Sequence, residues 1–338
     1  MNAQRCVSRR RIRGLLRRPV LRVAVLAAGL AILATSVVEA ASIGSLKQFR
    51  VPTANSGPRG ITLGSDGNFW FTEDSVQNVG RITPGGAITE FRQVCPSCLP
   101  NAIVQGPNNI LYFTSNDPGL GRITTGGVVM APVAPTNTGA LGNGIAAFGT
   151  DIWYASSVTN SIWRFNTVTS AFTEFLPPTA GSTYDVAVGA NGIVWFTENG
   201  ASKIGRLDPA SGVITETALT REPRQITVAT DGSVWFTERF AHAVGRLVPA
   251  TNQVTEFAPF TGAPSPEGIA AAPDGSVWIA QSFAGNVARL TLSATGTLVI
   301  AQGPTVNGSE PYYITIAPNG TPWYTERSAN EIAVLQLK

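Results

Sequence analysis

Short runs of apolar and β-branched residues recur along residues 46–338, separated by turns rich in glycine, proline and aspartate. No stretch places its apolar residues with the period of a helix. Turn sequences such as Ser65-Asp66-Gly67 are typical of β-hairpins. The pattern therefore predicts short antiparallel strands, four to a repeat. In the first repeat these are Ile61–Gly64, Asn68–Glu73, Val79–Thr83 and Ala87–Arg92.

An aromatic landmark marks the second strand of each repeat. It occurs seven times, at spacings of 42, 41, 42, 40, 43 and 45 residues. A fixed period of about forty residues with four strands per repeat predicts an all-β, seven-bladed propeller. The landmarks are Trp70-Phe71-Thr72-Glu73, Tyr112-Phe113-Thr114-Ser115, Trp153-Tyr154-Ala155-Ser156, Trp195-Phe196-Thr197-Glu198, Trp235-Phe236-Thr237-Glu238, Trp278-Ile279-Ala280-Gln281 and Trp323-Tyr324-Thr325-Glu326.

The two ends of the repeat region predict how the ring closes. The last repeat stops after its third strand, Ile332–Leu337, and Leu46–Val51 resembles the outer strands of the other repeats. We therefore expect the N-terminal strand to complete the last blade, which removes two sheet edges.

Arginine recurs in the third strand of six repeats, and glutamate recurs in the fourth strand of four. Hairpins centred on residues 74–77 and near Ser211 would set Trp70 opposite Arg81, and Arg206 opposite Glu216. These positions predict a Trp–Arg–Glu stripe across each blade, with guanidinium stacked on indole and paired with carboxylate. A feature copied in most blades is scaffold, so we expect Arg206 to support the fold and not a binding site.

Residues 1–40 have the pattern of a cleavable export signal. Eight arginines precede an uncharged run at residues 23–38, and small residues around Glu39 predict cleavage after Ala40. A membrane anchor is the alternative, although the run is shorter than a usual span. Ser8-Arg9-Arg10-Arg11-Ile12 loosely resembles a twin-arginine signal. We expect a periplasmic or extracellular protein whose residues 41–338 form a single propeller domain with no membrane span.

Charge excludes one class of partner. Only 13% of residues are charged, and without the first forty residues the chain has 16 basic and 20 acidic residues. The remaining Lys and Arg residues are spread along the sequence, whereas a nucleic-acid site needs them clustered. We expect a monomer that binds no nucleic acid.

The candidate site lies where the loops that enter the first strands meet the central channel, the usual ligand site of a propeller. One residue per repeat falls at this channel mouth: Arg59, Asn101, Asn143, Tyr184, Arg224, Glu267 and Tyr312. A second ring follows from the ends of the second strands: Glu73, Ser115, Ser156, Glu198, Glu238, Gln281 and Glu326.

The segments Ile61–Glu90 and Val186–Glu216 closely resemble the virginiamycin B lyase (streptogramin lyase) family, through DG, WFTE, IGR and ITEF motifs at fixed spacings. The resemblance covers residues 46–338. It implies a seven-bladed propeller that opens cyclic depsipeptide antibiotics by magnesium-assisted elimination.

The resemblance also implies histidine after the loop proline of the last two repeats, where this chain has Pro266-Glu267 and Pro311-Tyr312. Glu310 matches a family glutamate. Arg327 replaces a magnesium-binding glutamate, and Glu326 lies beside it as a candidate metal ligand. If catalysis persists, Glu267, Glu310 and Tyr312 are its candidate residues, and Glu267 or Glu310 would need a raised pKa to act as acid or base.

Histidine and cysteine are scarce and give two further candidates. His242 is the only histidine of the chain and falls in the loop after Glu238, where an exposed turn residue is the simpler interpretation. Cys95 and Cys98 flank a short loop sequence, and in an oxidising compartment they predict a local disulfide. Zinc binding would need further ligands.

Three functions stay open from the sequence. The first is a recognition propeller that binds a small molecule, cyclic peptide or glycan at the channel mouth. The second is a lyase or an ester or lactone hydrolase that uses carboxylates and a divalent cation such as Mg²⁺. The third is a protein-interaction module of the cell envelope. The fold does not decide between them.

Overall fold

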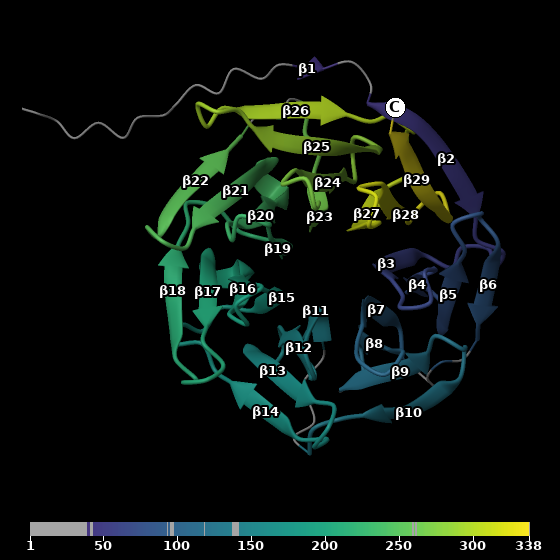
Figure 1. Cartoon of the computed structure of the whole chain (residues 1–338), viewed down its shortest axis with the longest axis horizontal. Helices are drawn as coiled ribbons and strands as arrows, with labels where there is room; N and C mark the ends of the chain where they lie inside the picture. Colours follow the sequence, from purple (N-terminus) through teal and green to yellow (C-terminus); the bar gives the residue numbers. More distant parts are fainter. Residues whose placement is uncertain are drawn as a thin grey trace, which may run out of the picture. The chain divides into compact units, whose positions relative to one another are not determined.

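The computed structural model describes residues 39–40, 43–92, 94, 98–117, 119–136, 142–258, 260 and 262–337. Residues 35–338 form one compact unit, built from seven antiparallel sheets that stand around a common centre (Figure 1). The all-β, seven-bladed propeller is therefore confirmed. The described helical residues are two short 3₁₀ turns, η1 (Asn199–Ala201) and η2 (Arg239–Ala241).

Each blade has four strands that follow one another from the centre of the ring outward. Blade 1 has β3 (Pro58–Leu63), β4 (Phe69–Glu73), β5 (Asn78–Ile82) and β6 (Ile88–Phe91). Blade 2 has β7 (Pro100–Gln105), β8 (Ile110–Ser115), β9 (Leu120–Thr124) and β10 (Val129–Val133). Blade 3 has β11 (Gly142–Phe148), β12 (Asp151–Ser156), β13 (Ser161–Asn166) and β14 (Phe172–Phe175). Blade 4 has β15 (Thr183–Val188), β16 (Val194–Glu198), β17 (Lys203–Leu207) and β18 (Ile214–Ala218).

The last three blades follow the same order. Blade 5 has β19 (Ile226–Val228), β20 (Val234–Glu238), β21 (Ala243–Val248) and β22 (Gln253–Phe257). Blade 6 has β23 (Pro266–Ala271), β24 (Val277–Gln281), β25 (Asn286–Leu292) and β26 (Leu298–Gln302), and β1 (Glu39–Ala40) pairs with β26 in parallel. Blade 7 has β27 (Pro311–Ile316), β28 (Pro322–Glu326), β29 (Glu331–Leu337) and β2 (Gly44–Arg50).

Ring closure is as the sequence predicts. β2 pairs with β29 along its whole length, from Gly44 opposite Leu337 to Arg50 opposite Glu331. The first long strand of the described chain is thus the outermost strand of the last blade, and blade 7 is held by strands from both ends of the sequence (Figure 1).

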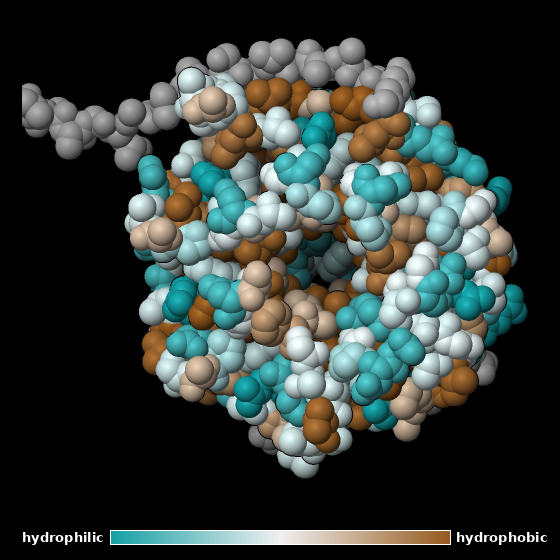
Figure 2. Space-filling model, in the orientation of Figure 1, coloured by the Kyte–Doolittle hydropathy of each residue, from teal (hydrophilic) through white to brown (hydrophobic). Residues whose placement is uncertain are grey.

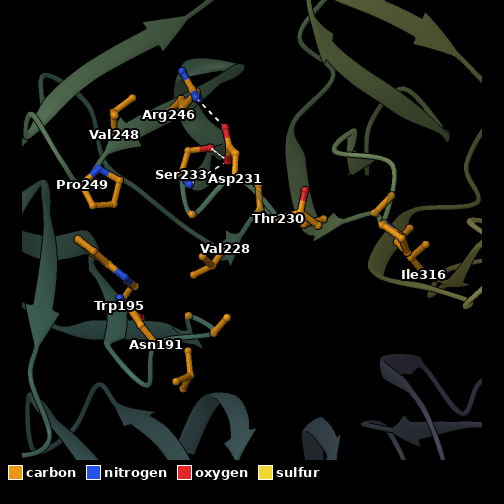
Figure 3. A pocket seen from close by; sticks show the side chains of 18 of the residues that line it. Asn191, Trp195, Val228, Thr230, Asp231, Ser233, Arg246, Val248, Pro249 and Ile316 are labelled. Atoms are coloured by element: carbon orange, nitrogen blue, oxygen red, sulfur yellow. Dashed lines mark hydrogen bonds and ion pairs between the residues drawn. The ribbon is translucent and has the colours of Figure 1, made fainter.

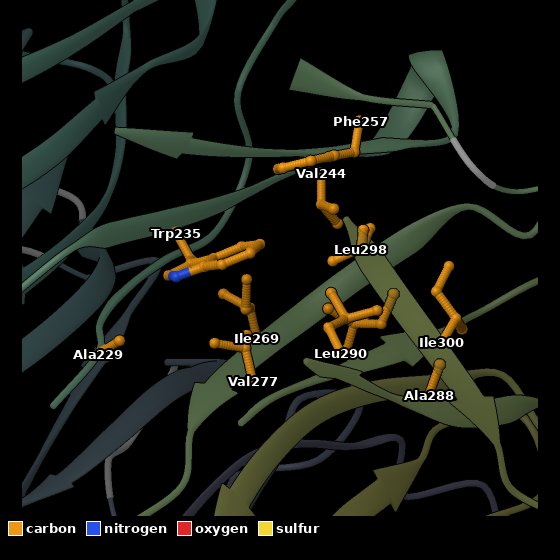
Figure 4. Close-up of a cluster of buried hydrophobic side chains, with 11 residues drawn as sticks. Ala229, Trp235, Val244, Phe257, Ile269, Val277, Ala288, Leu290, Leu298 and Ile300 are labelled. Atoms are coloured by element: carbon orange, nitrogen blue, oxygen red, sulfur yellow. The ribbon is translucent and has the colours of Figure 1, made fainter. Parts of the chain in front are cut away.

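The hydrophobic core lies between neighbouring blades. Trp235 of blade 5 stacks on Phe257 at 6.0 Å between ring centres, and both pack against Ile269 and Leu290 of blade 6 (Figure 4). The five residues of each WFTE-type second strand are all buried, as in β20. Burial of a tryptophan, or of Tyr112 in blade 2, against the next blade explains why the aromatic landmark recurs in the sequence.

The Trp–Arg part of the predicted stripe is present, and its Glu part is wrong. Arg206 lies 5.9 Å from the Trp195 ring and faces Thr215, while Glu216 pairs with Gly205. The hairpin is centred between Ala210 and Ser211, half a residue from the prediction, and this register turns the glutamate to the other face of the sheet.

The outer-strand glutamates instead bind the segments that connect neighbouring blades. Glu216 accepts hydrogen bonds from the amide and the hydroxyl of Thr179, in the segment that connects blade 3 to blade 4. Glu90 binds Thr53 and Glu256 binds Thr220 in the same way. Each glutamate therefore fixes the segment that enters its own blade.

Candidate functional site

The predicted channel-mouth residues share one structural position. Six innermost strands of the described chain contain a register shift near their first residues, such as the one between Pro58 and Ile61 in β3. A β-bulge of this kind re-aims a side chain. Arg59, Asn101, Asn143, Tyr184, Glu267 and Tyr312 lie within these shifts, and Arg224 lies just before β19.

In five blades a threonine of the second strand ties the start of the innermost strand to the next blade. Thr237 accepts a hydrogen bond from the Gln225 amide at 3.1 Å and donates one to the Glu267 carbonyl of the next blade at 2.9 Å. Sequence reasoning gave this threonine no role, although its recurrence in the landmark was the available signal. The same two bonds are made by Thr72, Thr114, Thr197 and Thr325.

Two arginines share one carboxylate on the blade 7 and blade 1 side. Asp74 Oδ2 lies 3.3 Å from Arg59 Nη1 and 3.0 Å from Arg327 Nη2. Their guanidinium carbons lie 5.1 Å and 5.8 Å from the centre of the Tyr312 ring. Cations at these distances from a ring face are attracted by it, so Tyr312 and Asp74 together hold both arginines. Sequence analysis did not identify Asp74.

Glu267 anchors a second pair of arginines. Its carboxylate is fully buried, with Oε1 2.6 Å from Arg239 Nη1 and Oε2 3.4 Å from Arg224 Nε. Burial raises the pKa of Glu267, and the two arginines oppose that shift. The Arg224 guanidinium lies 3.8 Å from the centre of the Tyr184 ring. Arg239, on η2, was not a sequence candidate, although it directly follows the landmark, at the same position of its repeat as Arg327.

Asp185 is an additional carboxyl group of the channel wall. It follows Tyr184 in the β15 bulge, and its Oδ2 accepts a hydrogen bond from the Ile226 amide at 3.0 Å. Burial raises the pKa of Asp185 to about 7. Burial also raises the pKa of Tyr313, which lies near Asp185. Neither residue was a sequence candidate.

Most members of the second predicted ring are buried within the blades, and Ser115 is the member that lines a pocket together with Arg59 and Asn101. Glu73, Glu198, Glu238 and Glu326 are fully buried, as are Ser115, Ser156 and Gln281. Their partners lie toward the outer strands, since Gln48 of β2 donates to Glu326 at 2.6 Å. Arg221 pairs with Glu238 at 3.6 Å.

Burial also changes the pKa of these carboxyl groups. Burial, together with Glu90, raises the pKa of Glu73 to about 7. Burial and Glu256 raise the pKa of Glu238 to about 8, and Glu198 reaches a pKa of about 7 through burial and Glu216. Because these carboxyl groups are buried within the blades, we expect their ionisation to change the stability of the fold and not the binding of a ligand.

Glu310, His242 and Cys98 complete the sequence candidates. Glu310 is half-buried on the loop before β27 and accepts a hydrogen bond from the Ser328 hydroxyl. His242 caps η2 and accepts a hydrogen bond from the Ser265 amide at Nδ1, 3.3 Å away. Cys98 is buried and disulfide-bonded. Cys95, its expected partner, lies outside the described residues, so the pairing stays a prediction.

A pocket of 530 Å³ opens at the channel-mouth end. Arg59, Asp74, Arg327, Asn101 and Asn143 line it, which brings together residues of blades 1, 2, 3 and 7. The space-filling view of the ring shows a hollow at the centre of the face it presents (Figure 2).

A larger pocket of 1040 Å³ lies at the opposite end of the strands, among hairpin tips of blades 4 to 7. Its wall includes Trp195, Val228, Pro249 and Ile316, and the Asp231–Arg246 ion pair lies at its edge (Figure 3). The charged residues of the ring are not part of this second pocket.

The donors at the channel mouth do not fit a divalent cation. Within the described ranges, no group of three or more His, Cys, Asp or Glu side chains could hold a metal ion. Glu326, the candidate ligand, is buried against Gln48, and Arg327 directs a guanidinium toward Asp74. The described part of the chain also forms no helix of the length and apolarity needed to cross a bilayer.

Comparison with known proteins gives consistent matches. The sequence model of the virginiamycin B lyase family matches residues 34–221 and 145–338. A virginiamycin B lyase from Staphylococcus aureus is 26% identical, with a TM-score of 0.78 over 87% of this chain and 99% of that one. A catalytically inactive variant of the same enzyme with quinupristin gives 26% identity and a TM-score of 0.77, over 87% and 99%. A streptogramin B lyase structure is 24% identical, with a TM-score of 0.79 over 88% and 98%.

Proposed function

The chain belongs to the virginiamycin B lyase family, and we propose that it is a ligand-binding member that does not catalyse the family's elimination. In this proposal the protein is exported, and its site is the pocket at the channel mouth. The observation that carries the proposal is the pairing of Glu267 with Arg224 and Arg239. The resemblance expects a histidine at this position.

General acid–base catalysis needs a group that can reach the substrate proton. Glu267 is fully buried and both of its oxygens face guanidinium groups. Tyr312, at the second expected histidine position, is buried between Arg59 and Arg327. Both residues therefore position arginines, and the two beside Tyr312, Arg59 and Arg327, line the pocket.

The residues at the expected metal position support the same proposal. A magnesium site needs oxygen ligands, whereas Arg327 contributes a cation. Binding without turnover is therefore the function that these side chains support.

The test is incubation of the purified protein with a type B streptogramin and Mg²⁺, followed by chromatography with mass detection. The Staphylococcus aureus virginiamycin B lyase is the positive control. We expect the antibiotic to stay intact. A shifted peak of unchanged mass would show elimination and refute the proposal. A product heavier by one water would show hydrolysis and refute it in favour of an esterase.

A further inference from the structure

The channel-mouth pocket has an excess of positive charge. Arg59 and Arg327 line it and share Asp74. Arg224 and Arg239, which share Glu267, are not among its lining residues. In each group two guanidiniums surround one carboxylate. The side chain of Arg327 is 38% exposed, whereas that of Asp74 is 7% exposed. Arg59, Arg327 and Asp74 all line the pocket, so its lining carries one net positive charge, with Arg327 more exposed than Asp74.

Several polar atoms of this wall lack partners among the described residues. Nε of Arg59 and Nε of Arg327 are buried donors without an acceptor, and Asn101 Oδ1 has no donor. Asn101 is 8% exposed and lines the pocket. A buried polar group without a partner costs about 1–3 kcal/mol. A ligand that supplies both acceptors and a donor would recover part of that cost.

The rest of the wall is polar as well. Side chains of Asn116, Asn143, Ser115 and Ser157 offer amide and hydroxyl groups, which both donate and accept hydrogen bonds. The apolar side chains of this wall are Leu99 and Val158. The volume of 530 Å³ lies within the range of small-molecule sites. Arginines beside many amide and hydroxyl groups are suited to bind an anion that carries hydroxyl groups.

We propose that the pocket binds a sugar acid, with the carboxylate on Arg59 and Arg327 and the hydroxyl groups on the asparagine and serine side chains. Arginine presents a planar pair of donors that matches a carboxylate. The proposal rests on the recognition function argued above and names the ligand class of that same site.

The experiment is isothermal titration calorimetry of the purified protein with digalacturonate and glucuronate. The dimethyl ester of digalacturonate and glucose serve as neutral counterparts, and acetate and phosphate serve as anions without a sugar. We expect saturable binding of a sugar acid at least about tenfold tighter than of its neutral counterpart, weakened by salt. No binding of either acid, or equal binding of acetate or phosphate, would overturn the proposal.

Two variants locate the binding. Arg327→Gln should weaken binding of the sugar acid about tenfold or more, because a hydrogen bond to a charged group is lost. Arg50→Gln removes the same charge from an exposed position of β2 and should leave the affinity unchanged. Asp74→Asn removes the shared negative charge and should strengthen binding, whereas a merely structural role of Asp74 would weaken it.

The two proposals fail in different ways. If the neutral sugars bind and the acids do not, the recognition function stands and the charge argument is wrong. If a streptogramin is opened, the recognition proposal fails. The titrations with sugar acids then still show whether the pocket binds a sugar acid.

Discussion

Replacement of Glu238 by glutamine should stabilise the protein at alkaline pH. Glu238 is fully buried at the end of β20, with Arg221 3.6 Å away. Burial and the neighbouring Glu256 raise the pKa of Glu238 to about 8, while Arg221 opposes the shift. The folded protein therefore holds a proton on this group over a pH range in which the unfolded chain has released it.

The sign and size follow from this difference in protonation. A raised pKa in the folded state means that stability is complete below the unfolded pKa and is lost as pH rises through the folded pKa. Between about pH 5 and pH 8, this group alone lowers the free energy of unfolding by about 1.4 kcal/mol per pH unit. Glu73 and Glu198, with pKa values of about 7, act in the same direction.

The assay is urea denaturation of the wild type and Glu238→Gln at a series of pH values across this range. Glutamine keeps the shape and a donor but cannot ionise, so the two curves should be close near pH 5 and diverge steadily toward pH 8. Glu222→Gln, at an exposed position, is the matched control and should follow the wild type. Parallel curves for Glu238→Gln and wild type would refute the assignment of a raised pKa to this group.

The other predictions concern the threonines of the second strands, the closure strand β2 and the predicted export signal. Thr237→Val should lower the free energy of unfolding by about 1–3 kcal/mol, because the Gln225 amide loses a buried acceptor, whereas Thr237→Ser should keep most of the stability in the same urea assay. Deletion of residues 41–51 should lower the melting temperature, since it exposes the edge of β29, and an unchanged melting temperature would contradict closure by β2. The mass of protein recovered outside the cytoplasm should correspond to a chain that begins after Ala40, and an uncleaved chain held in the membrane would instead support the anchor alternative.

The fold was predictable because the sequence repeats at a nearly fixed spacing. Each second strand repeats an aromatic landmark at about forty residues, and Leu46–Val51 resembles an outer strand, so strand number, blade number and closure follow from local patterns. The strand bounds differ by up to three residues, as with β3, which begins at Pro58 where the prediction began at Ile61. The Arg206–Glu216 pairing failed because side chains alternate between the faces of a strand, so a small error in the turn moves a residue to the opposite face.

The site was predictable only in part. Residues such as Arg59 and Glu267 were found because they occupy one position per repeat. Asp74 and Arg239 directly follow the landmark, also at one position per repeat, but the residue type there varies from blade to blade, and the role of these two residues depends on contacts with a neighbouring blade. The buried orientation of Glu73 and Glu238 was also missed, because the sequence shows that an acid ends the strand but not which side of the blade it faces.

Leu46 pairs with Leu335, near the end of the chain, so the ring can close only after nearly all of the chain has been made. A chain that emerges from a ribosome or a translocon N-terminus first can assemble blades 1 to 6 from hairpins as each is released. The strand β2, although among the first to appear, has no partner until the last residues arrive, so it must wait for nearly the whole chain. Contacts of such long sequence separation form slowly. A stall or cut near the C-terminus would therefore leave an open ring with two exposed sheet edges, which are prone to pair with other chains.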